Sequence, residues 1–492
     1  MACPEKGSRA YLFSIVLVAV LGGLLFGYDT AVISGAEKGL EAFFRGASDF
    51  TYTNFFHGLT SSSALIGCVI GSALSGLFAT RFGRKRSLII AGICFFISAW
   101  GSMCPEMYGI LPVGKPSLPL LWVFNFYRVL GGIGVGIASA ICPMYIGEVA
   151  PSGIRGMLVS WNQFAIIFGQ LVVYFVNLMI LGSHANPIYD AAGAIANALD
   201  AQWTIESGWR YMFGSECVPA ALFTVLICLV PETPRYLVMT GKQDKALAVL
   251  SKINGLGTAK EILADIQGTL TEKKEKLFSY GFMCIFIGIM LSVFQQAVGI
   301  NAVLYYAPRI FQDMGMSNPM VQTVIMGVVN IAFTLLAVFT VEKWGRRPLL
   351  IWGSIGMAIG AFGVALTFGN EALSFITMIS IMVYSASFMF SWGPICWVLI
   401  AEIFPNTIRG AAVAIAVAFQ WIFNFIVSST FVPMFNMHLT AGDDFGHWFT
   451  YGLYGTICVI AAIFVWRLVP ETKGKTLEDM SRLWRKDGVV RN

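Results

Sequence analysis

Twelve long apolar runs limit what this chain can fold into. Each run is close to the length of about 20 residues that a helix needs to cross a bilayer, and none alternates with the period of a membrane-spanning strand. Because lipid offers the backbone no partners, a spanning segment must satisfy its own N–H and C=O groups, as an α-helix does. We therefore expect an all-α polytopic membrane protein with twelve transmembrane helices. The runs lie at about residues 11–35, 57–79, 87–104, 119–142, 157–181, 211–230, 279–306, 320–341, 348–368, 374–400, 411–434 and 448–469.

The composition excludes the soluble classes of protein. Charged residues make up 12% of the chain and hydrophobic residues 57%, whereas a soluble domain has about 25% charged residues. This excludes a soluble globular protein, a disordered chain and a coiled coil. The first run follows Lys6 and Arg9, as a signal peptide would, but it is too long, ends in no small-residue cleavage site and contains Asp29. We interpret it as the first permanent span.

Lysine and arginine are concentrated on one side of the predicted membrane. If the N-terminus is cytoplasmic, the cytoplasmic segments contain 26 Lys and Arg residues and the opposite loops contain five. Cytoplasmic loops of membrane proteins carry an excess of these residues. Both termini are therefore expected in the cytoplasm, which agrees with an even number of spans.

Three motifs occur twice, in the same order, once in each half of the chain. Residues 81–85 (RFGRK) and 343–347 (KWGRR) follow the second and eighth spans. The same spacing of Glu, Pro, Arg and Gly follows spans 4 and 10, and a Pro-Glu-Thr motif follows spans 6 and 12. Such duplication is typical of transporters whose two halves rock around a central site. We expect a six-helix N-terminal half at 1–230, a cytoplasmic linker with short amphipathic helices (for example 244–253 and 260–270) at 231–277, a six-helix C-terminal half at 278–470 and a cytoplasmic tail at 471–492.

With these motifs the chain resembles the sugar porter family of the major facilitator superfamily over nearly its full length. The segments 22–29, 127–128, 162–170 and 391–394 resemble the bacterial proton–xylose symporters of that family, and only segment 182–209 fits less well. The resemblance implies the major facilitator fold and import of a monosaccharide, xylose or a similar pentose or hexose, with a proton. It also implies a multi-pass protein of the plasma (inner) membrane that works as a monomer in the lipid bilayer, with no cofactor, no metal and no nucleic acid.

Two charged residues lie inside the predicted spans. Asp29 is in span 1, and Arg128 is in span 4 before a Gly-rich run at 131–136. An ionised side chain in the bilayer costs about 2.5–3.5 kcal/mol on insertion scales, so such residues are usually paired and functional. We expect the two to pair, and protonation of Asp29 would weaken the pair and let the halves rearrange. The alternative is a static structural pair; the resemblance favours the active role, since the family's proton symporters have Asp here.

Glu216, early in span 6, is the third embedded charge. The resemblance implies that it tunes the proton acceptor. An ion pair with Arg210 at the end of the span is the alternative.

Amides and tryptophans gather in spans 5, 7, 8, 10 and 11. An amide both donates and accepts hydrogen bonds, as a vicinal diol requires, and an indole presents a flat apolar face to a sugar ring. Gly299 and Pro308 predict that span 7 is broken, which is typical of binding sites in transporters. For an isolated amide the alternative is adhesion between helices. The resemblance implies direct sugar contacts from Gln163, Gln295, Gln296, Asn301, Trp397 and Gln420, and a cavity lined by Phe26, Gln170, Tyr305, Asn330, Gly393 and Trp421.

Acidic and basic groups also recur at the cytoplasmic ends of the spans. Such charges can bridge the halves when the cytoplasmic side is shut, and a network present in one state biases the equilibrium between states. For the isolated cations, a topology signal is an equally good interpretation. The predicted cytoplasmic gate consists of Arg84, Glu148, Arg155, Arg235, Arg346, Glu402 and Arg409.

Other functions receive less support. A facilitative uniporter is the nearest alternative, and a membrane sugar sensor would need a longer signalling tail than the roughly 20 residues after the last span. An enzyme is not expected, because the chain has no nucleophile elbow or Walker loop. The ten cysteines show no disulfide or zinc spacing. The histidines, which predict no metal cluster, are scattered at His57, His184, His438 and His447.

Overall fold

The computed structural model describes residues 7–106, 114–151, 154–188, 195–269, 277–316, 318–437, 445–473 and 484. Every regular secondary-structure element within these ranges is a helix, so the expected all-α fold is confirmed. Twelve segments of the described chain are long and apolar enough to cross a membrane, and they match the twelve predicted runs in order. The chain is therefore a multi-pass membrane protein. The nine cysteines within the described ranges are free thiols.

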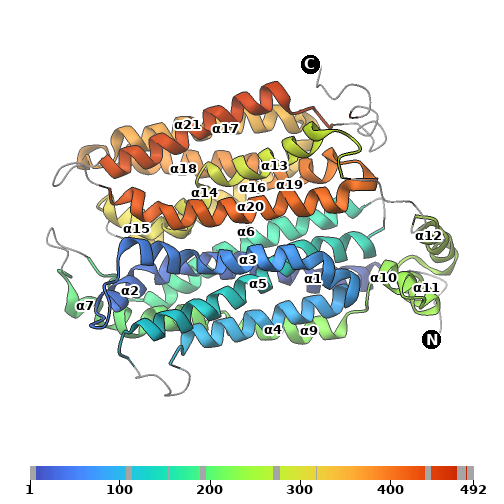
Figure 1. The fold of residues 1–492 in the computed structure, drawn as a ribbon, viewed down its shortest axis with the longest axis horizontal. Helices are drawn as coiled ribbons and strands as arrows, with labels where there is room; N and C mark the ends of the chain where they lie inside the picture. Colours follow the sequence, from blue (N-terminus) through green and yellow to red (C-terminus); the bar gives the residue numbers. More distant parts are fainter. Residues whose placement is uncertain are drawn as a thin grey trace.

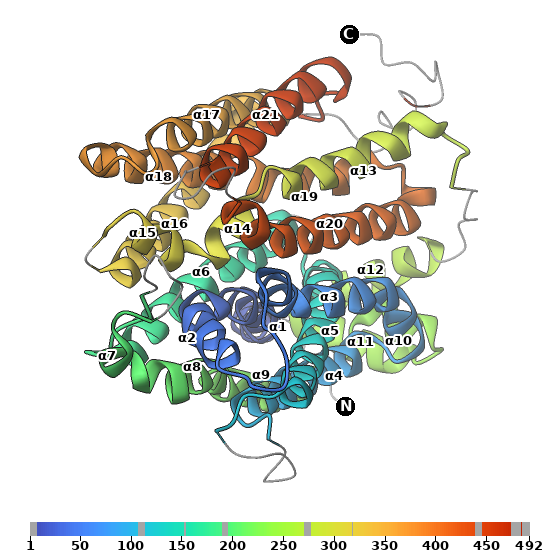
Figure 2. The same cartoon turned by 60° about the vertical axis from the view of Figure 1, so that its left-hand side comes forward.

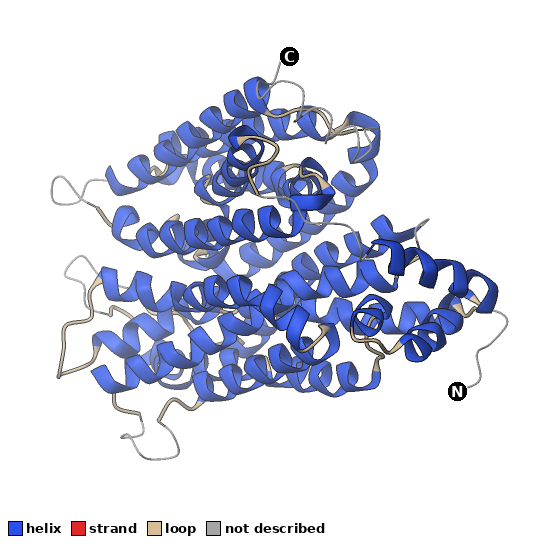
Figure 3. Ribbon diagram, turned by 45° about the vertical axis from the view of Figure 1, so that its right-hand side comes forward, coloured by secondary structure: helices blue, strands red, loops and turns tan. Residues whose placement is uncertain are grey.

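The helices form two bundles that lie side by side (Figure 1, Figure 3). We call α1–α9 the N-terminal half and α13–α21 the C-terminal half. The N-terminal half contains α1 (Arg9–Ala31), α2 (Ile33–Arg45), α3 (Asn54–Arg81), α4 (Arg84–Met103), α5 (Leu118–Val149), α6 (Arg155–Leu181), α7 (Ala198–Trp203), the π-helix η3 (Thr204–Gly208), α8 (Trp209–Gly214) and α9 (Cys217–Leu229).

The C-terminal half repeats this plan, and its spans 7 and 10 are each divided into separate helices. It contains α13 (Phe282–Ala297), α14 (Ile300–Tyr305), α15 (Ala307–Asp313), α16 (Pro319–Trp344), α17 (Arg346–Thr367), the short 3₁₀-helix η4 (Glu371–Leu373), α18 (Ser374–Phe390), α19 (Trp392–Ile403), α20 (Asn406–Phe435) and α21 (Phe445–Leu468). Span 7 breaks at Gly299, as predicted, because this residue has a φ of 91°. Positive φ costs little for glycine and much for other residues.

Three short helices connect the halves outside the bundles. They are α10 (Pro234–Met239), α11 (Gln243–Asn254) and α12 (Leu256–Thr269), and the last two correspond to the predicted amphipathic helices. We call the end of the molecule beside α10–α12 the linker end. The opposite end, where α2, α7 and α15 lie, is the α2 end (Figure 1, Figure 2).

Small residues bring α3 and α5 into backbone contact. A side chain on Gly132 would collide with the backbone of Ala64, and one on Gly136 with the backbone of Cys68. The Gly-rich run is therefore a close helix contact, which membrane helices use because small residues let their backbones approach. The contact fixes the position of Arg128, one turn before Gly132 on α5.

Two predicted spans begin or end elsewhere than expected. The first span does not end near residue 35, because helix α2 continues the chain to Arg45. The sixth candidate span begins at Ala198 rather than near 211. Residues 198–209 of the segment 182–209 are therefore helical, while residues 189–194 lie outside the described ranges.

Candidate functional site

A buried ion pair joins α1 and α5 in the middle of the N-terminal half. Nη1 of Arg128 donates a hydrogen bond of 2.6 Å to Oδ1 of Asp29, and Nη2 donates one of 3.1 Å to the backbone oxygen of Asp29. The ring of Phe213 lies 4.9 Å from the guanidinium carbon. Removing one member of such a buried pair leaves an uncompensated charge, at a cost of about 3–5 kcal/mol. The expected contact between Asp29 and Arg128 is present.

Glu216 lies beside this pair. It is fully buried at the start of α9, and Asp29 and Arg128 are the charged groups within electrostatic range of its carboxyl group. The alternative partner, Arg210, instead donates a 2.9 Å hydrogen bond to Glu106. The predicted alternative of a Glu216–Arg210 pair is therefore wrong, and the carboxyl group of Glu216 belongs to the surroundings of Asp29.

Four amides of the C-terminal half form one hydrogen-bonded chain. Gln420 on α20 donates to Oε1 of Gln295 on α13. Gln296 donates to the same oxygen over 3.5 Å, and Asn301, after the break in span 7, donates to Gln296 over 2.6 Å. Gln295 in turn donates to the backbone oxygens of Trp392 and Gly393 on α19, at 3.0 and 3.3 Å.

Aromatic side chains of α14 and α20 lie against the N-terminal half. Trp421 on α20 packs against Phe26 on α1, with ring centroids 5.4 Å apart, and its indole nitrogen has no partner among the described residues. Tyr305 on α14 lies against Asn424 of α20 and Thr30 of α1, within electrostatic range of Asp29. Tyr305 therefore lies between α20, which carries Gln420, and α1, which carries Asp29.

Four other predicted residues have no hydrogen bond to this amide chain among the described contacts. Gln163 and Gln170 are two turns apart on α6, the first half-buried and the second buried. Asn330 on α16 is satisfied by Ser385 of α18, whose hydroxyl donates to it over 2.7 Å. Trp397, one turn beyond Gly393 on α19, is half-buried. Of the predicted sugar contacts, the structure therefore joins Gln295, Gln296, Asn301 and Gln420 by hydrogen bonds.

The linker end carries the same ion pair in each half. Nη2 of Arg84 donates to Glu148 over 2.6 Å, and Nη2 of Arg346 donates to Glu402 over 2.9 Å. Each acid–base pair therefore joins two different motifs of the same half. Arg155 and Arg409 instead donate to backbone oxygens five residues earlier, and Arg235 is exposed.

The two Pro-Glu-Thr motifs cap helices. Glu232 accepts hydrogen bonds from the backbone N–H groups of Arg84 and Lys85 at the start of α4. Glu471 does the same for Arg346 and Arg347 at the start of α17. A carboxylate is stabilised there because the first N–H groups of a helix lack partners within it. Each Pro-Glu-Thr motif, which follows the last transmembrane helix of its half, therefore caps the helix that begins at the RFGRK or KWGRR motif of that half.

The sequence did not predict the ion-pair cluster at the α2 end, which joins the two halves. Nη1 of Arg309 on α15 donates to Glu37 over 2.7 Å and to Glu41 over 2.9 Å, both on α2. His57 on α3 contacts Glu37 over 2.7 Å. Burial alone would lower the pKa of Arg309, but Glu41 and Glu37 outweigh it and hold that pKa well above its usual range. A charged guanidinium is therefore enclosed between the halves.

A weaker pair lies beside this cluster. Lys38 donates to Asp313 over 3.2 Å, and the Asp313 side chain is 31% exposed. The sequence signal for the whole group was the spacing of Glu37, Glu41 and Arg45 every four residues, which places them on one helical face. Lys38, Arg45 and Arg309 are among the five Lys and Arg residues on the side of the predicted membrane opposite the cytoplasm, so the Lys and Arg count alone does not indicate their pairing.

The comparisons with known proteins agree with this architecture. The chain matches the family described as sugar (and other) transporter over residues 15–484. It belongs to this sugar transporter family. It is 48% identical to the D-xylose-proton symporter of Escherichia coli strain K12, over 98% of this chain and 97% of the relative. It is 35% identical to the glucose facilitated diffusion protein of Zymomonas mobilis, over 98% and 99% of the two chains.

The fold is also similar to a solved transporter. The inward-open conformation of the xylose transporter XylE from Escherichia coli superposes with a TM-score of 0.83 at 47% identity, covering 96% of this chain and all of that one. The sugar transporters to which the chain is similar are not enzymes, in agreement with the expected transport function.

Proposed function

We propose that the chain is a secondary active transporter that imports a monosaccharide with a proton by alternating access. The observation that carries this proposal is the buried contact of Asp29 with Arg128. A carboxylate can take up a proton, whereas a guanidinium cannot lose one in a protein. Protonation of Asp29 removes the attraction between the two groups, so the bound proton changes how α1 and α5 pack, with Glu216 as a neighbouring acid that tunes the process.

The sugar binds to the linked amides Gln295, Gln296, Asn301 and Gln420, with Gln163 and Trp397 as further contacts. Amides supply the paired donors and acceptors that sugar hydroxyls need, and no cation is required for a neutral substrate. Phe26, Gln170, Tyr305, Asn330, Gly393 and Trp421 line the cavity. The contacts of Tyr305 with Thr30 and Asn424 support a route from the sugar to Asp29. The similar symporter from Escherichia coli makes xylose, or a related pentose or hexose, the expected substrate.

The linker end faces the cytoplasm of the cell, and the structure corresponds to an inward-facing state. The 26 Lys and Arg residues on one side of the predicted membrane support cytoplasmic termini in the plasma (inner) membrane. Arg309 joins the halves at the α2 end, while Arg84 and Arg346 pair within their own halves. In the outward-facing state, the charged groups at the linker end exchange these partners for ones in the opposite half. The transporter works as a monomer.

Transport in proteoliposomes tests the proposal. Asp29→Asn keeps the size of the side chain but cannot change its charge. We expect it to abolish accumulation of labelled xylose driven by a pH gradient while sugar exchange across the membrane continues. Asp244→Asn, at an exposed position on α11, is the matched control and should accumulate sugar like the unchanged protein. Accumulation against the gradient in Asp29→Asn would contradict proton coupling through this residue.

A facilitative uniporter is the second candidate, because the similar protein of Zymomonas mobilis is a facilitated diffusion protein. The same assay separates the two. A uniporter equilibrates sugar but does not accumulate it in response to a pH gradient, with or without Asp29. Competition of labelled xylose with glucose and other sugars then identifies the substrate.

A further inference from the structure

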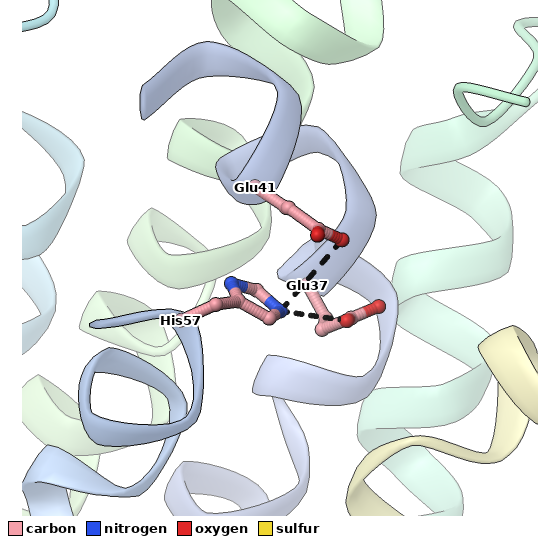
Figure 4. A group of neighbouring side chains, drawn as sticks. All are labelled: Glu37, Glu41 and His57. Atoms are coloured by element: carbon pink, nitrogen blue, oxygen red, sulfur yellow. Dashed lines mark hydrogen bonds and ion pairs between the residues drawn. The ribbon is translucent and has the colours of Figure 1, made fainter. Parts of the chain in front are cut away.

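Three potential metal ligands lie together at the α2 end. Glu37 and Glu41 are four residues apart on α2, so they share a face, and His57 reaches them from α3. Their ligand atoms all lie within 4.8 Å of one another, and each residue is buried. Figure 4 shows the imidazole ring of His57 turned toward both carboxylates. All three belong to the N-terminal half, so movement of the C-terminal half does not separate them.

The chemistry of these ligands suits a divalent transition-metal ion. One imidazole nitrogen and two carboxylates are the ligand types that Zn²⁺ takes in sites with three protein ligands. Nε2 of His57 faces Glu37 and Glu41, while Nδ1 lies 3.1 Å from the hydroxyl of Tyr52. A contact on the far nitrogen is what fixes the orientation of a metal-binding histidine. The ring is thus held with one nitrogen directed at the two acids.

A cation from the other half already occupies this position. Arg309 contacts both acids, and its side chain comes from α15 in the C-terminal half. Glu41 has a second partner on its own helix, Arg45, whereas the ion pairs of Glu37 are with Arg309 and His57. Withdrawal of Arg309 therefore removes the permanent positive charge from Glu37. The group then has two carboxylates, one imidazole and room for a new cation.

We propose that Glu37, Glu41 and His57 form a binding site for a divalent metal ion such as Zn²⁺ that becomes available when α15 withdraws Arg309. This step rests on the proposed alternating access, since opening the α2 end separates α15 from α2. Bound metal takes the place of Arg309. Because a ligand shifts an equilibrium toward the state that it binds better, the metal holds the α2 end open and inhibits transport.

Zn²⁺ binding to the purified full-length protein in detergent, measured by isothermal titration calorimetry without sugar, tests the site. We expect His57→Gln to weaken binding at least tenfold. Arg309→Gln removes the competing cation and should tighten binding at least tenfold. Arg309→Lys keeps a charge but loses the fork of the guanidinium, so its affinity for Zn²⁺ should lie between those of the unchanged protein and Arg309→Gln. His184→Gln, at an exposed histidine, is the matched control and should bind Zn²⁺ like the unchanged protein.

Several results would overturn the site. They are unchanged affinity in His57→Gln, weaker binding in both Arg309 variants, or a loss of binding in His184→Gln. Size-exclusion profiles and melting temperatures identify variants that fail to fold. If Arg309→Gln does not fold, Arg309→Lys is used to test the competition between Arg309 and the metal. The titration requires no transport, so a failed metal site and a failed sugar–proton symporter give different results. Sugar exchange in proteoliposomes, measured with and without external ZnCl₂, then tests inhibition, which EDTA should reverse. The rate of each variant with metal is compared to its own rate without metal.

Discussion

Gln420 on α20 donates a hydrogen bond to the side-chain oxygen of Gln295 on α13. The bond ties the unbroken eleventh span to the piece of span 7 that precedes the break at Gly299. Gln295 is also anchored to the backbone of α19, while Oε1 of Gln420 has no partner among the described residues. A buried acceptor without a partner is costly unless a ligand or water satisfies it. Gln420 is therefore the amide most directly prepared for a sugar hydroxyl.

Gln420→Ala should weaken sugar binding. It removes both the donor to Gln295 and the free acceptor, so we expect the Kd for the transported sugar to rise at least tenfold, which equals about 1.4 kcal/mol. Calorimetric titration of the purified protein measures this. Gln202→Ala, at an exposed position on α7, is the control and should keep the original Kd. An unchanged Kd in Gln420→Ala would place the sugar elsewhere.

The break in span 7 should tolerate no side chain. Gly299 has a φ of 91°, and a Cβ there would collide with the ring of Tyr454. Gly281 has a similar φ of 88° but open space around it. Both Gly→Ala variants are strained in the backbone, so a larger drop in melting temperature for Gly299→Ala isolates the collision. Equal drops would show that the contact with Tyr454 has no consequence.

The two cross-half ion pairs at the α2 end should differ in strength. Arg309 is enclosed by two buried carboxylates, so Arg309→Gln should destabilise this conformation by about 3–5 kcal/mol. Lys38→Gln breaks the pair with Asp313, which should cost less, because the Asp313 side chain is 31% exposed and water can solvate the carboxylate that is left. Labelling of a cysteine introduced beside α2 reports how far this end opens. Greater labelling in Lys38→Gln than in Arg309→Gln would reverse the assignment.

The capping carboxylates should stabilise the two halves to a similar degree. Glu232→Gln and Glu471→Gln each replace a charged acceptor at a helix N-terminus by a neutral one, at an expected cost of about 0.3–1 kcal/mol. Thermal unfolding should show two small decreases of similar size. Glu261→Gln on α12 is a control of the same chemistry and should leave the melting temperature unchanged, since Glu261 is exposed. A large effect of Glu232→Gln alone would mean that the repeat is not functionally symmetric.

The sequence predicted those parts of the fold that depend on apolar length and on glycine. The twelve spans and the break at Gly299 both follow from such local patterns. The pairing of Asp29 with Arg128 could be predicted because both are charged residues deep in apolar runs. The partners of Glu148 and Glu402 could not, since Arg84 and Arg346 come from separate motifs that only folding brings together.

The α2 end shows a second limit of the sequence. Lys38, Arg45 and Arg309 have the same side chains as topology-determining cations. The helical spacing of Glu37 and Glu41 indicates a shared face, but it does not show which residue of the other half lies against that face. The burial of Lys38 and Arg309 depends on α2 continuing past the predicted end of the first span and on α15 packing against it. Contacts between the halves are the part of the structure that a pattern within one segment predicts least.

Span 7 is divided into α13, α14 and α15, which together form one arm with two joints. Residues with different roles lie along this arm. Gln295 and Gln296 lie just before its first joint, Tyr305 at its second, and Arg309 on its last piece. In the proposed transport cycle, sugar bound to the amides moves the middle of this arm inward, and the same backbone carries Arg309. The affinity for sugar measured from the α2 side then includes the free energy needed to separate Arg309 from α2. The reason is that the apparent affinity falls in proportion to the population of the binding-competent state. A mutation that strengthens the contact of Arg309 with α2 would therefore reduce sugar uptake at low sugar concentration, although every proposed sugar-binding side chain is unchanged.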